Sequence, residues 1–196
     1  MENANLQNDS DTDQDLLIKE ACHDSAAFAQ LYRLHYDNIF RYCARRLFNR
    51  HAAEDITSIV FFKAMRTIGS FNGNSKDFRN WLYRIATNAV NDHLRTAKRR
   101  ADAIDNIAMV QGRDHAFDAK SDAEFQEEVL PVKQALLTLK PKQQTVITLR
   151  FFENLQLTAI AEILGQNPAT TRSQLSRALG SLRRKLEASA GHGREV

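Results

Sequence analysis

The chain has 196 residues and a formal net charge of +3, and 43% of its residues are hydrophobic, which can support one packed domain or two small ones. Only 7 glycines and 3 prolines are present, so a turn-rich β-sandwich or barrel is disfavoured and helices are expected. No stretch approaches the roughly 18 apolar residues of a membrane span, and the acidic N-terminus lacks the basic start of a signal peptide, so we expect a cytoplasmic protein.

Two cysteines, Cys22 and Cys43, lie far apart in the sequence, with no CxxC pair and no paired histidine motif near them. The sequence therefore predicts neither a zinc site nor a disulfide framework, and both thiols are expected to be small buried hydrophobes. It also contains no phosphate-cradling glycine loop and no nucleophile–base pair. We expect no metal, no cofactor and no enzymatic activity.

Charge is segregated along the chain. Residues 21–100 carry a net charge of +8 (14 basic, 6 acidic) and residues 131–196 carry +6 (10 basic, 4 acidic). Residues 1–20 carry −5 (1 basic, 6 acidic) and residues 101–130 carry −6 (2 basic, 8 acidic). Two basic blocks around an acidic stretch predict two small domains with a polyanionic partner, although solvated helix faces would give the same pattern. The expected organisation is a disordered acidic tail at 1–14, a domain at 15–100, an acidic flexible linker at 101–130, a second domain at 131–188 and a tail at 189–196.

The first basic block has the pattern of a helical bundle. Apolar residues from Leu16 onward recur at steps of three, four and seven, which predicts one or two amphipathic helices. The acids of Ala53-Glu54-Asp55 suit the first turn of a further helix that runs through Met65. Turn-forming residues from Gly69 to Asp77 then break the period, and an aromatic-rich helix resumes at Phe78.

This last helix combines aromatic, amide and basic side chains and ends in Lys98-Arg99-Arg100. Aromatic faces stack on bases at about 1 to 3 kcal/mol each, while Lys and Arg neutralise phosphates. Because duplex DNA hides its base faces, such a surface suits melted or flipped bases. The alternative is that Trp81, Leu82 and Ile85 are simply core, and for Trp81 that alternative is favoured.

The second basic block predicts a helix-turn-helix. Pro141 marks the start of a first helix, at the position that needs no backbone donor. A short helix follows at Leu157–Leu164 and is closed by Gly165, before a turn at 166–168. A longer helix is expected from Ala169 to about Glu187, with its apolar stripe formed by Leu175, Leu179, Leu182 and Leu186.

The other faces of this longer helix are polar and basic. This arrangement, in which a tight turn joins a short helix to a longer polar helix, is the one that places a recognition helix in a DNA major groove. Arg and Gln there can bond bidentately to guanine and adenine, and each good pair discriminates by about 1 to 3 kcal/mol. The run Arg183-Arg184-Lys185 is better placed for phosphates. Helical hairpins that never touch DNA can show the same stripe and charge.

Taken together, these motifs resemble a bacterial RNA polymerase sigma factor of the sigma-70 family, specifically its small extracytoplasmic-function (ECF) group. The resemblance covers residues 16–100 and 131–187, and its most specific stretch is Phe78-Arg79-Asn80-Trp81-Leu82-Tyr83-Arg84-Ile85-Ala86-Thr87-Asn88. It implies an all-α fold in which a region 2 helical bundle and a region 4 helix-turn-helix are joined by the acidic linker.

The resemblance also implies a function. Such a factor directs core RNA polymerase to promoters, recognises the minus-10 and minus-35 elements and stabilises open-complex DNA. Implied partners are core RNA polymerase, duplex and melted promoter DNA and, as a candidate, an anti-sigma factor, with no membrane insertion.

The implied site residues fall into three sets. The polymerase-binding set is Asp55, Ile56, Ser58, Ile59 and Phe62. The set for the melted minus-10 strand is Phe71, Asn72, Asn74, Lys76, Tyr83, Arg84, Asn88 and Arg95. The set for the minus-35 duplex is Thr170, Arg172, Ser173, Gln174, Ser176 and Arg177.

The chain departs from the family pattern at several of these positions. Ser58 and Ile59 stand where the family usually has Gln and an acid, so the polar polymerase contacts differ. Thr171 replaces an apolar core residue and Gln174 a basic one, so the family's minus-35 sequence preference does not transfer.

Two other function classes are compatible with the sequence. A stand-alone repressor or activator would use only the helix-turn-helix, and it would be a homodimer that binds duplex DNA without polymerase. A nucleic-acid-modifying enzyme would need a carboxylate or histidine cluster, for which Asp92 and His93 are the nearest candidates. We expect those two residues to be structural or strand-contacting.

Overall fold

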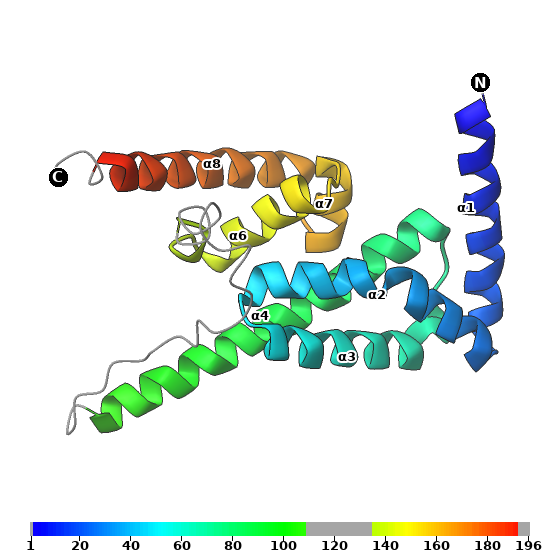
Figure 1. Ribbon diagram of the computed structural model, residues 1–196, viewed down its shortest axis with the longest axis horizontal. Helices are drawn as coiled ribbons and strands as arrows, with labels where there is room; N and C mark the ends of the chain where they lie inside the picture. Colours follow the sequence, from blue (N-terminus) through cyan, green and yellow to red (C-terminus); the bar gives the residue numbers. More distant parts are fainter. Residues whose placement is uncertain (1, 109–134, 192–196) are drawn as a thin grey trace. The chain divides into compact units, whose positions relative to one another are not determined.

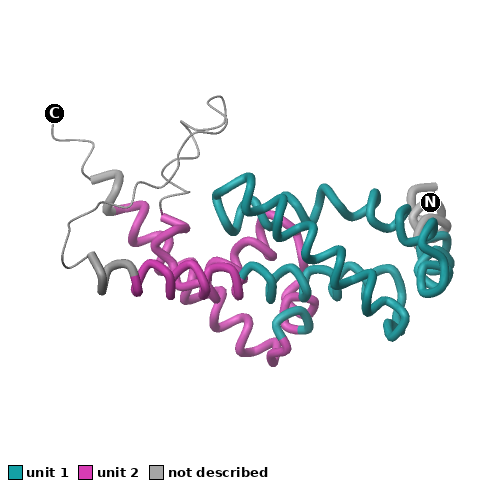
Figure 2. The backbone as a smooth tube through the Cα atoms, turned by 90° about the horizontal axis from the view of Figure 1, so that it is seen from below, with its two compact units in different colours: residues 1–90, 162–164 teal, residues 91–161, 165–196 magenta. Residues whose placement is uncertain are grey.

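The computed structural model describes the backbone of residues 2–108 and 135–191 and the side chains of residues 12–103 and 135–187. Every regular element in these ranges is a helix, which confirms the predicted fold class. The chain divides into two compact units, residues 1–90 with 162–164 and residues 91–161 with 165–196 (Figure 2).

The first unit starts with α1 (Glu2–Ala21), α2 (Ser25–Leu47) and α3 (Arg50–Thr67) (Figure 1). Short capped turns separate these helices. The Asp24 carboxylate accepts the Ala26 N–H at 2.8 Å at the start of α2, and the Asn49 amide oxygen accepts the Ala52 N–H at 2.8 Å at the start of α3. Phe48 closes α2 in the left-handed conformation, with φ of 52°.

Residues 2–14 differ from the predicted disordered tail, because they form the first turns of α1. The other end of α1 is anchored in the unit by Ile18 and Ala21, which are 2% and 5% exposed. Once one end of a helix is fixed, each further turn adds hydrogen bonds without a new nucleation cost.

The core of the first unit lies between α2, α3 and the N-terminal half of α4 (Ser75–Ala108). Its side chains are apolar residues that repeat at helical spacing, as the sequence pattern predicts. The most deeply buried aliphatic residues are Leu31, Ile39, Val60, Leu82 and Val90. Neither Cys22 nor Cys43 forms a disulfide, Cys43 is fully buried as expected, and Cys22 is only partly buried.

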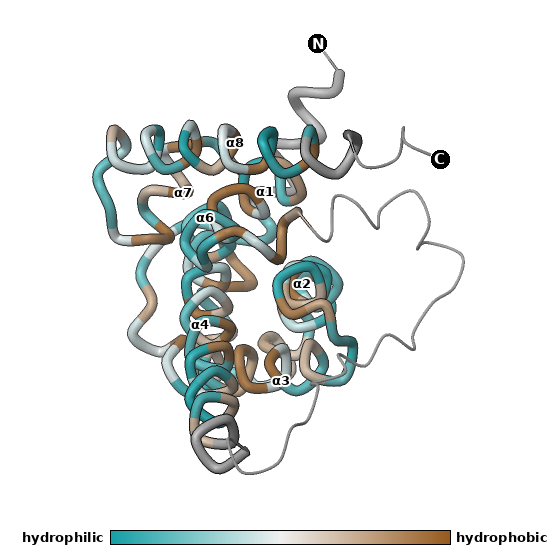
Figure 3. The backbone as a smooth tube through the Cα atoms, turned by 90° about the vertical axis from the view of Figure 1, so that its left-hand side faces the viewer, coloured by the Kyte–Doolittle hydropathy of each residue, from teal (hydrophilic) through white to brown (hydrophobic). Residues whose placement is uncertain are grey.

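α4 continues eight residues past the predicted domain end at Arg100, so the first part of the predicted linker is helical. The segment 75–108 contains no glycine or proline that would end the helix. Bands of hydrophilic and hydrophobic residues alternate along α4 (Figure 3). The rest of the predicted linker, residues 109–130, lies outside the described residues.

The second unit contains α6 (Pro141–Ile147), the π-helical turn η3 (Thr148–Phe152), α7 (Leu157–Leu164) and α8 (Pro168–Gly191). Pro141 occupies the first position of α6, as predicted. The buried Gln144 amide donates to the carbonyls of Leu136 and Leu139, at 2.9 and 3.1 Å, and so ties the preceding segment to α6. α8 extends three residues into the predicted C-terminal tail, and residues 192–196 lie outside the described part of the chain.

The turn between α7 and α8 has the predicted geometry. Gly165 ends α7 at φ of 60°, a conformation that glycine adopts without strain, and the Gln166 N–H donates to the Ala161 carbonyl at 2.8 Å. The Asn167 side chain then caps α8 by accepting the Ala169 N–H at 2.8 Å. The predicted helix-turn-helix elements are therefore present.

The buried stripe of α8 is shifted from the predicted leucine row. Thr171 and Ala178 are both 0% exposed, whereas Leu179 is 39% exposed and Leu175 and Leu182 are half-buried. Thr171 can occupy this apolar position because its hydroxyl donates to the Asn167 carbonyl at 3.4 Å, which satisfies the polar group within the helix.

Candidate nucleic-acid interface and polymerase-binding face

The loop before α4 is held by a reciprocal pair of hydrogen bonds. The Asn74 side chain accepts the Asp77 N–H at 3.0 Å, and the Asp77 carboxylate accepts the Asn74 N–H at 3.2 Å. The backbone is also tightly folded at Gly73, where a Cβ atom would lie 2.9 Å from the Phe71 ring and 2.8 Å from the Asp77 Cβ. Glycine at this position therefore lets the loop fold back on itself.

An aromatic cluster joins this loop to α4. The Phe71 ring lies 5.5 Å from the Phe78 ring, nearly perpendicular to it, and 5.2 Å from the Trp81 ring. Phe78 is buried, whereas Phe71 and Trp81 are half-buried. The sequence pattern favours a core position for Trp81, but its side chain is only half-buried, so one part of the ring packs in the cluster and another part is accessible.

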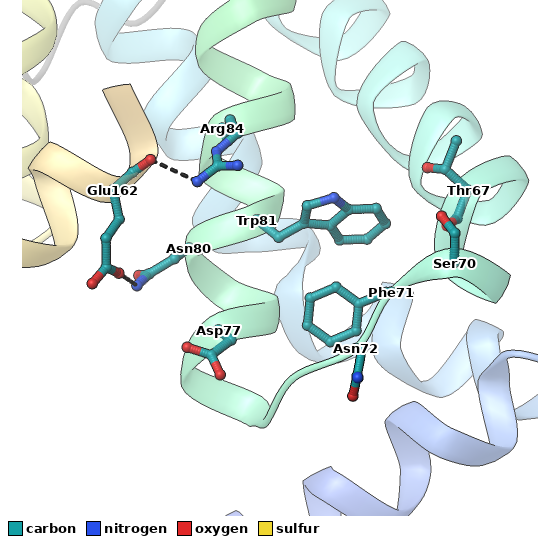
Figure 4. Close-up of a pocket in the computed structure, with 9 residues that line it drawn as sticks. All are labelled: Thr67, Ser70, Phe71, Asn72, Asp77, Asn80, Trp81, Arg84 and Glu162. Carbon is teal, nitrogen blue, oxygen red and sulfur yellow. Dashed lines mark hydrogen bonds between the residues drawn. The ribbon is translucent and has the colours of Figure 1, made fainter. Parts of the chain in front are cut away.

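Phe71 and Trp81 form one wall of a pocket beside α4. Figure 4 shows the two rings side by side, with Thr67 and Ser70 across from them. The lining also includes polar and charged side chains from the loop and from α4, namely Asn72, Asp77, Asn80 and Arg84. Aromatic faces beside hydrogen-bonding groups are the elements that hold an unstacked base.

The outward face of α4 carries several of the predicted strand-binding residues. Arg84, Asn88 and Arg95 are exposed, and Arg95 forms an ion pair with Asp92. The loop residues of the same set, Asn72, Asn74 and Lys76, are exposed as well. These side chains are exposed along one side of the helix and its preceding loop.

Tyr83 does not share this exposure. Its side chain is 3% exposed and packs edge-on against Tyr42, with the ring centres 5.5 Å apart. The expectation that Tyr83 contacts the strand therefore disagrees with the structure, because a ring buried between α2 and α4 offers no face for a base. The helical period explains the difference, since Tyr83 lies on the same side of α4 as Ala86 and Val90.

The predicted polymerase-binding set lies on α3. Asp55, Ser58, Ile59 and Phe62 are exposed, and Phe62 is exposed to 56%. Ile56 is only 6% exposed and belongs to the core, so its side chain is not part of this face. The Arg66 guanidinium lies over the Phe62 ring at 5.8 Å and adds a basic edge.

The predicted duplex-binding residues lie on the first turns of α8. Thr170, Arg172, Ser173, Ser176 and Arg177 are exposed, whereas Gln174 is half-buried. Arg177 donates to the Ser173 hydroxyl and to the Ser173 carbonyl, at 3.2 Å each. This pairing orients the guanidinium along the same face as Thr170 and Ser173.

The structure adds residues that the sequence interpretation missed. Met65 is 49% exposed and extends the α3 face, and its spacing of three from Phe62 could have indicated it. Thr67, Ser70 and Asn80 also line the pocket, and no local pattern could have indicated them, because they come from three different helical elements that only the packing brings together.

No group of described His, Cys, Asp and Glu side chains could hold a metal ion. None of the helices in the described ranges has the length and hydrophobicity needed to cross a membrane.

Comparison with protein families identifies both halves of the chain. The model for sigma-70 region 2 matches residues 31–100, and the model for sigma-70 region 4 matches residues 130–182. The loop, the aromatic wall of the pocket and the α3 face lie within the first match, and most of α8 lies within the second.

Similar proteins cover almost the whole chain. The ECF RNA polymerase sigma factor SigW of Bacillus subtilis is 34% identical over 83% of this chain and 90% of its own length. The ECF RNA polymerase sigma-E factor of Haemophilus influenzae is 31% identical over 90% of this chain and 96% of its own.

Two solved structures have a similar fold. The sigma factor RpoE of Bartonella quintana, solved in complex with the anti-sigma factor NepR, has a TM-score of 0.65 and 22% identity over 82% of this chain and 96% of its own. CnrH, solved in complex with the cytosolic domain of CnrY, has a TM-score of 0.66 and 20% identity over 89% of this chain and 97% of its own. The chain therefore belongs to the ECF RNA polymerase sigma factors of the sigma-70 family, and its function is to direct RNA polymerase to promoters in transcription initiation.

Proposed function

We propose that the chain recognises two different forms of promoter DNA with two separate surfaces. The loop before α4 and the outward face of α4 bind the melted minus-10 strand, and the N-terminal turns of α8 bind the minus-35 duplex. A third surface, on α3, binds core RNA polymerase.

The observation that carries the proposal is the pocket walled by Phe71 and Trp81. Its aromatic faces favour an unpaired base, and the exposed Arg84 and Asn88 continue the surface along α4 toward the backbone of the strand. Tyr83 has no direct part in this contact because it is buried.

The α8 surface carries side chains that suit recognition of duplex DNA. Arg172 and Arg177 are exposed near the start of a helix that follows a tight turn, which is where a recognition helix meets base edges. The half-buried Gln174 is less accessible, so we propose Arg172 as the main determinant.

The exposed apolar residues Ile59, Phe62 and Met65 on α3 support the polymerase contact. Asp55 and Ser58 lie on the same helix and provide polar groups at the rim of the apolar patch. This arrangement of an apolar centre with a polar rim is typical of protein interfaces.

We further propose that the chain has no catalytic activity and needs no cofactor, since polymerisation belongs to its partner. Asp92, a candidate for an enzymatic cluster, is ion-paired with Arg95, which supports a structural role. It would act in the cytoplasm, where RNA polymerase is found. An anti-sigma factor is a proposed partner, because the sigma factor RpoE, which has a similar fold, was solved in complex with the anti-sigma factor NepR.

Reconstitution tests this function. The purified chain is added to core RNA polymerase with DNA fragments from upstream of its own gene, and discrete transcripts are expected. A homodimer that binds these fragments specifically without polymerase would instead support the repressor hypothesis. The proposal is rejected if no promoter-dependent transcript appears while a control sigma factor is active.

The α3 face is tested with Phe62→Ala. Because the ring is 56% exposed, its removal should leave folding intact but weaken binding to core polymerase by about tenfold or more, as expected for an aromatic interface anchor. Binding is measured by titrating labelled protein with core enzyme. Leu34→Ala, at a residue 51% exposed on α2, is the matched control and should bind normally. Equal losses for both variants would contradict the assignment.

A further inference from the structure

α1 contacts the loop that walls the pocket, although the two are far apart in the sequence. The Asp15 carboxylate accepts the Ser75 N–H at 2.5 Å, at the first residue of α4. Asp15 is half-buried, so this charge-assisted bond is partly shielded from water. The contact fixes the point where the loop enters α4.

A second contact fixes the other end of the loop. The Cys22 thiol, just after α1, lies 3.4 Å from the Ile68 carbonyl and 3.5 Å from the Ile18 carbonyl, within donating distance of both. Ile68 is the first residue of η1 (Ile68–Ser70) and is 3% exposed. The thiol therefore links the C-terminal end of α1 to the start of η1.

The residues between these two points form part of the pocket. Ser70, Phe71 and Asn72 all line it and all lie between Ile68 and Ser75. Their position therefore depends in part on how the two ends of the segment are held. A loop fixed at both ends loses less conformational freedom when it binds a ligand.

We propose that Asp15 and Cys22 are positioning residues for base selection in the pocket, acting through the backbone at Ser75 and Ile68. This inference rests on the proposed function of the pocket and adds α1 to the determinants of minus-10 specificity. We expect the Asp15 contact to be the stronger of the two, because a hydrogen bond accepted by a carboxylate is stronger than one donated by a thiol.

Two substitutions of Asp15 separate positioning from general stability. Asp15→Ala removes the acceptor, whereas Asp15→Asn keeps an acceptor oxygen and loses only the charge. Asp13→Ala, at an exposed acid on the same helix, is the matched control. Hydrogen exchange on the free protein is the first measurement, and Asp15→Ala should raise exchange at the Ser75 amide about tenfold. Asp13→Ala should leave that exchange unchanged.

The second measurement is base selection by the holoenzyme. Each variant is assembled with core polymerase and incubated with short single-stranded DNA of randomised sequence, and the bound fraction is sequenced. The wild type should enrich a particular base at the position held by the pocket. Asp15→Ala should reduce that enrichment severalfold with core binding unchanged, and Asp15→Asn should restore most of it.

The same comparison applies to Cys22. Cys22→Ser keeps a donor and should retain base selection, whereas Cys22→Ala should lower it less than Asp15→Ala does. Unchanged enrichment in Asp15→Ala overturns the positioning role, as does an equal loss in Asp13→Ala.

The two measurements distinguish failure of this inference from failure of the proposed function. If the wild type enriches no base, the proposed function of the pocket is rejected, and the proposed effect of α1 on base selection is rejected as well. In that case exchange at Ser75 still shows whether Asp15 holds the loop.

Discussion

Tyr42 forms a fully buried polar contact between α2 and α4. Its hydroxyl lies 2.7 Å from the Thr87 hydroxyl, and its ring meets Tyr83 edge-on. Burial raises the pKa of Tyr42, although the nearby Arg46 guanidinium and the bond to Thr87 oppose this change. Because Thr87 immediately precedes Asn88, the contact helps to orient the face of α4 that we propose binds the melted strand.

The substitution Tyr42→Phe tests this contact. It keeps the ring but removes the hydroxyl, so Thr87 loses a buried partner and the free energy of unfolding should fall by about 1 to 3 kcal/mol. Urea denaturation measures the change. Tyr32→Phe, at a residue 38% exposed, serves as the control and should have little effect. A loss in the control as large as in Tyr42→Phe would show that the buried hydroxyl has no special role.

α2 also packs against α4 through a buried histidine. His35 is 8% exposed and its ring lies 5.4 Å from that of Phe78. Burial, aided by the positive charge of Arg79, lowers the pKa of His35 to about 4. His35 is therefore neutral in the folded protein at neutral pH.

Stability should depend on pH through this residue. Between pH 6.5 and pH 4 the unfolded chain protonates His35 while the folded chain does not, so stability falls as the pH falls. From pH 7 to pH 5 the loss should be about 2 kcal/mol, measured by urea denaturation. His35→Leu should remove this part of the pH dependence, and the exposed His93→Leu should not. If the free energy of unfolding of His35→Leu falls with pH as steeply as that of the wild type, the account is contradicted.

The helices whose ends carry strong local signals were predictable from the sequence. Pro141 and Gly165 mark where α6 begins and α7 ends, because each suits a backbone geometry that few residues adopt. Helix ends without such signals were not predictable. α4 passes Arg100, and α1 includes the acidic tail, since composition alone does not show where a polar helix stops.

The candidate site was predictable as a set of residue types but not as a geometry. The aromatic, amide and basic residues of α4 indicate an unpaired strand, but only part of the set is exposed: Arg84, Asn88 and Arg95 are exposed, whereas Trp81 is half-buried and Tyr83 is buried. The burial of Tyr83 depends on the packing partner Tyr42, which is 41 positions away in the chain, and no local pattern shows it. The contact from Asp15 to Ser75 is equally non-local, 60 positions apart.

At the scale of the whole molecule, the two basic blocks of the sequence correspond to the two sigma-70 regions. Each block carries its own proposed DNA-binding surface. The first combines aromatic rings with amides around a pocket, and the second places arginines on a helix that follows a tight turn. The central claim is that these two surfaces bind different forms of DNA.

The most direct test compares Asn88→Ala and Arg172→Ala in the reconstituted holoenzyme. Binding is measured to two probes, a single strand carrying the minus-10 sequence and a duplex carrying the minus-35 sequence, both taken from a mapped promoter. Asn88→Ala should weaken binding only to the single strand, and Arg172→Ala should weaken binding only to the duplex. Each loss should be about 1 to 3 kcal/mol of binding free energy. The account is contradicted if either variant weakens both probes equally, or if Asn88→Ala weakens only the duplex.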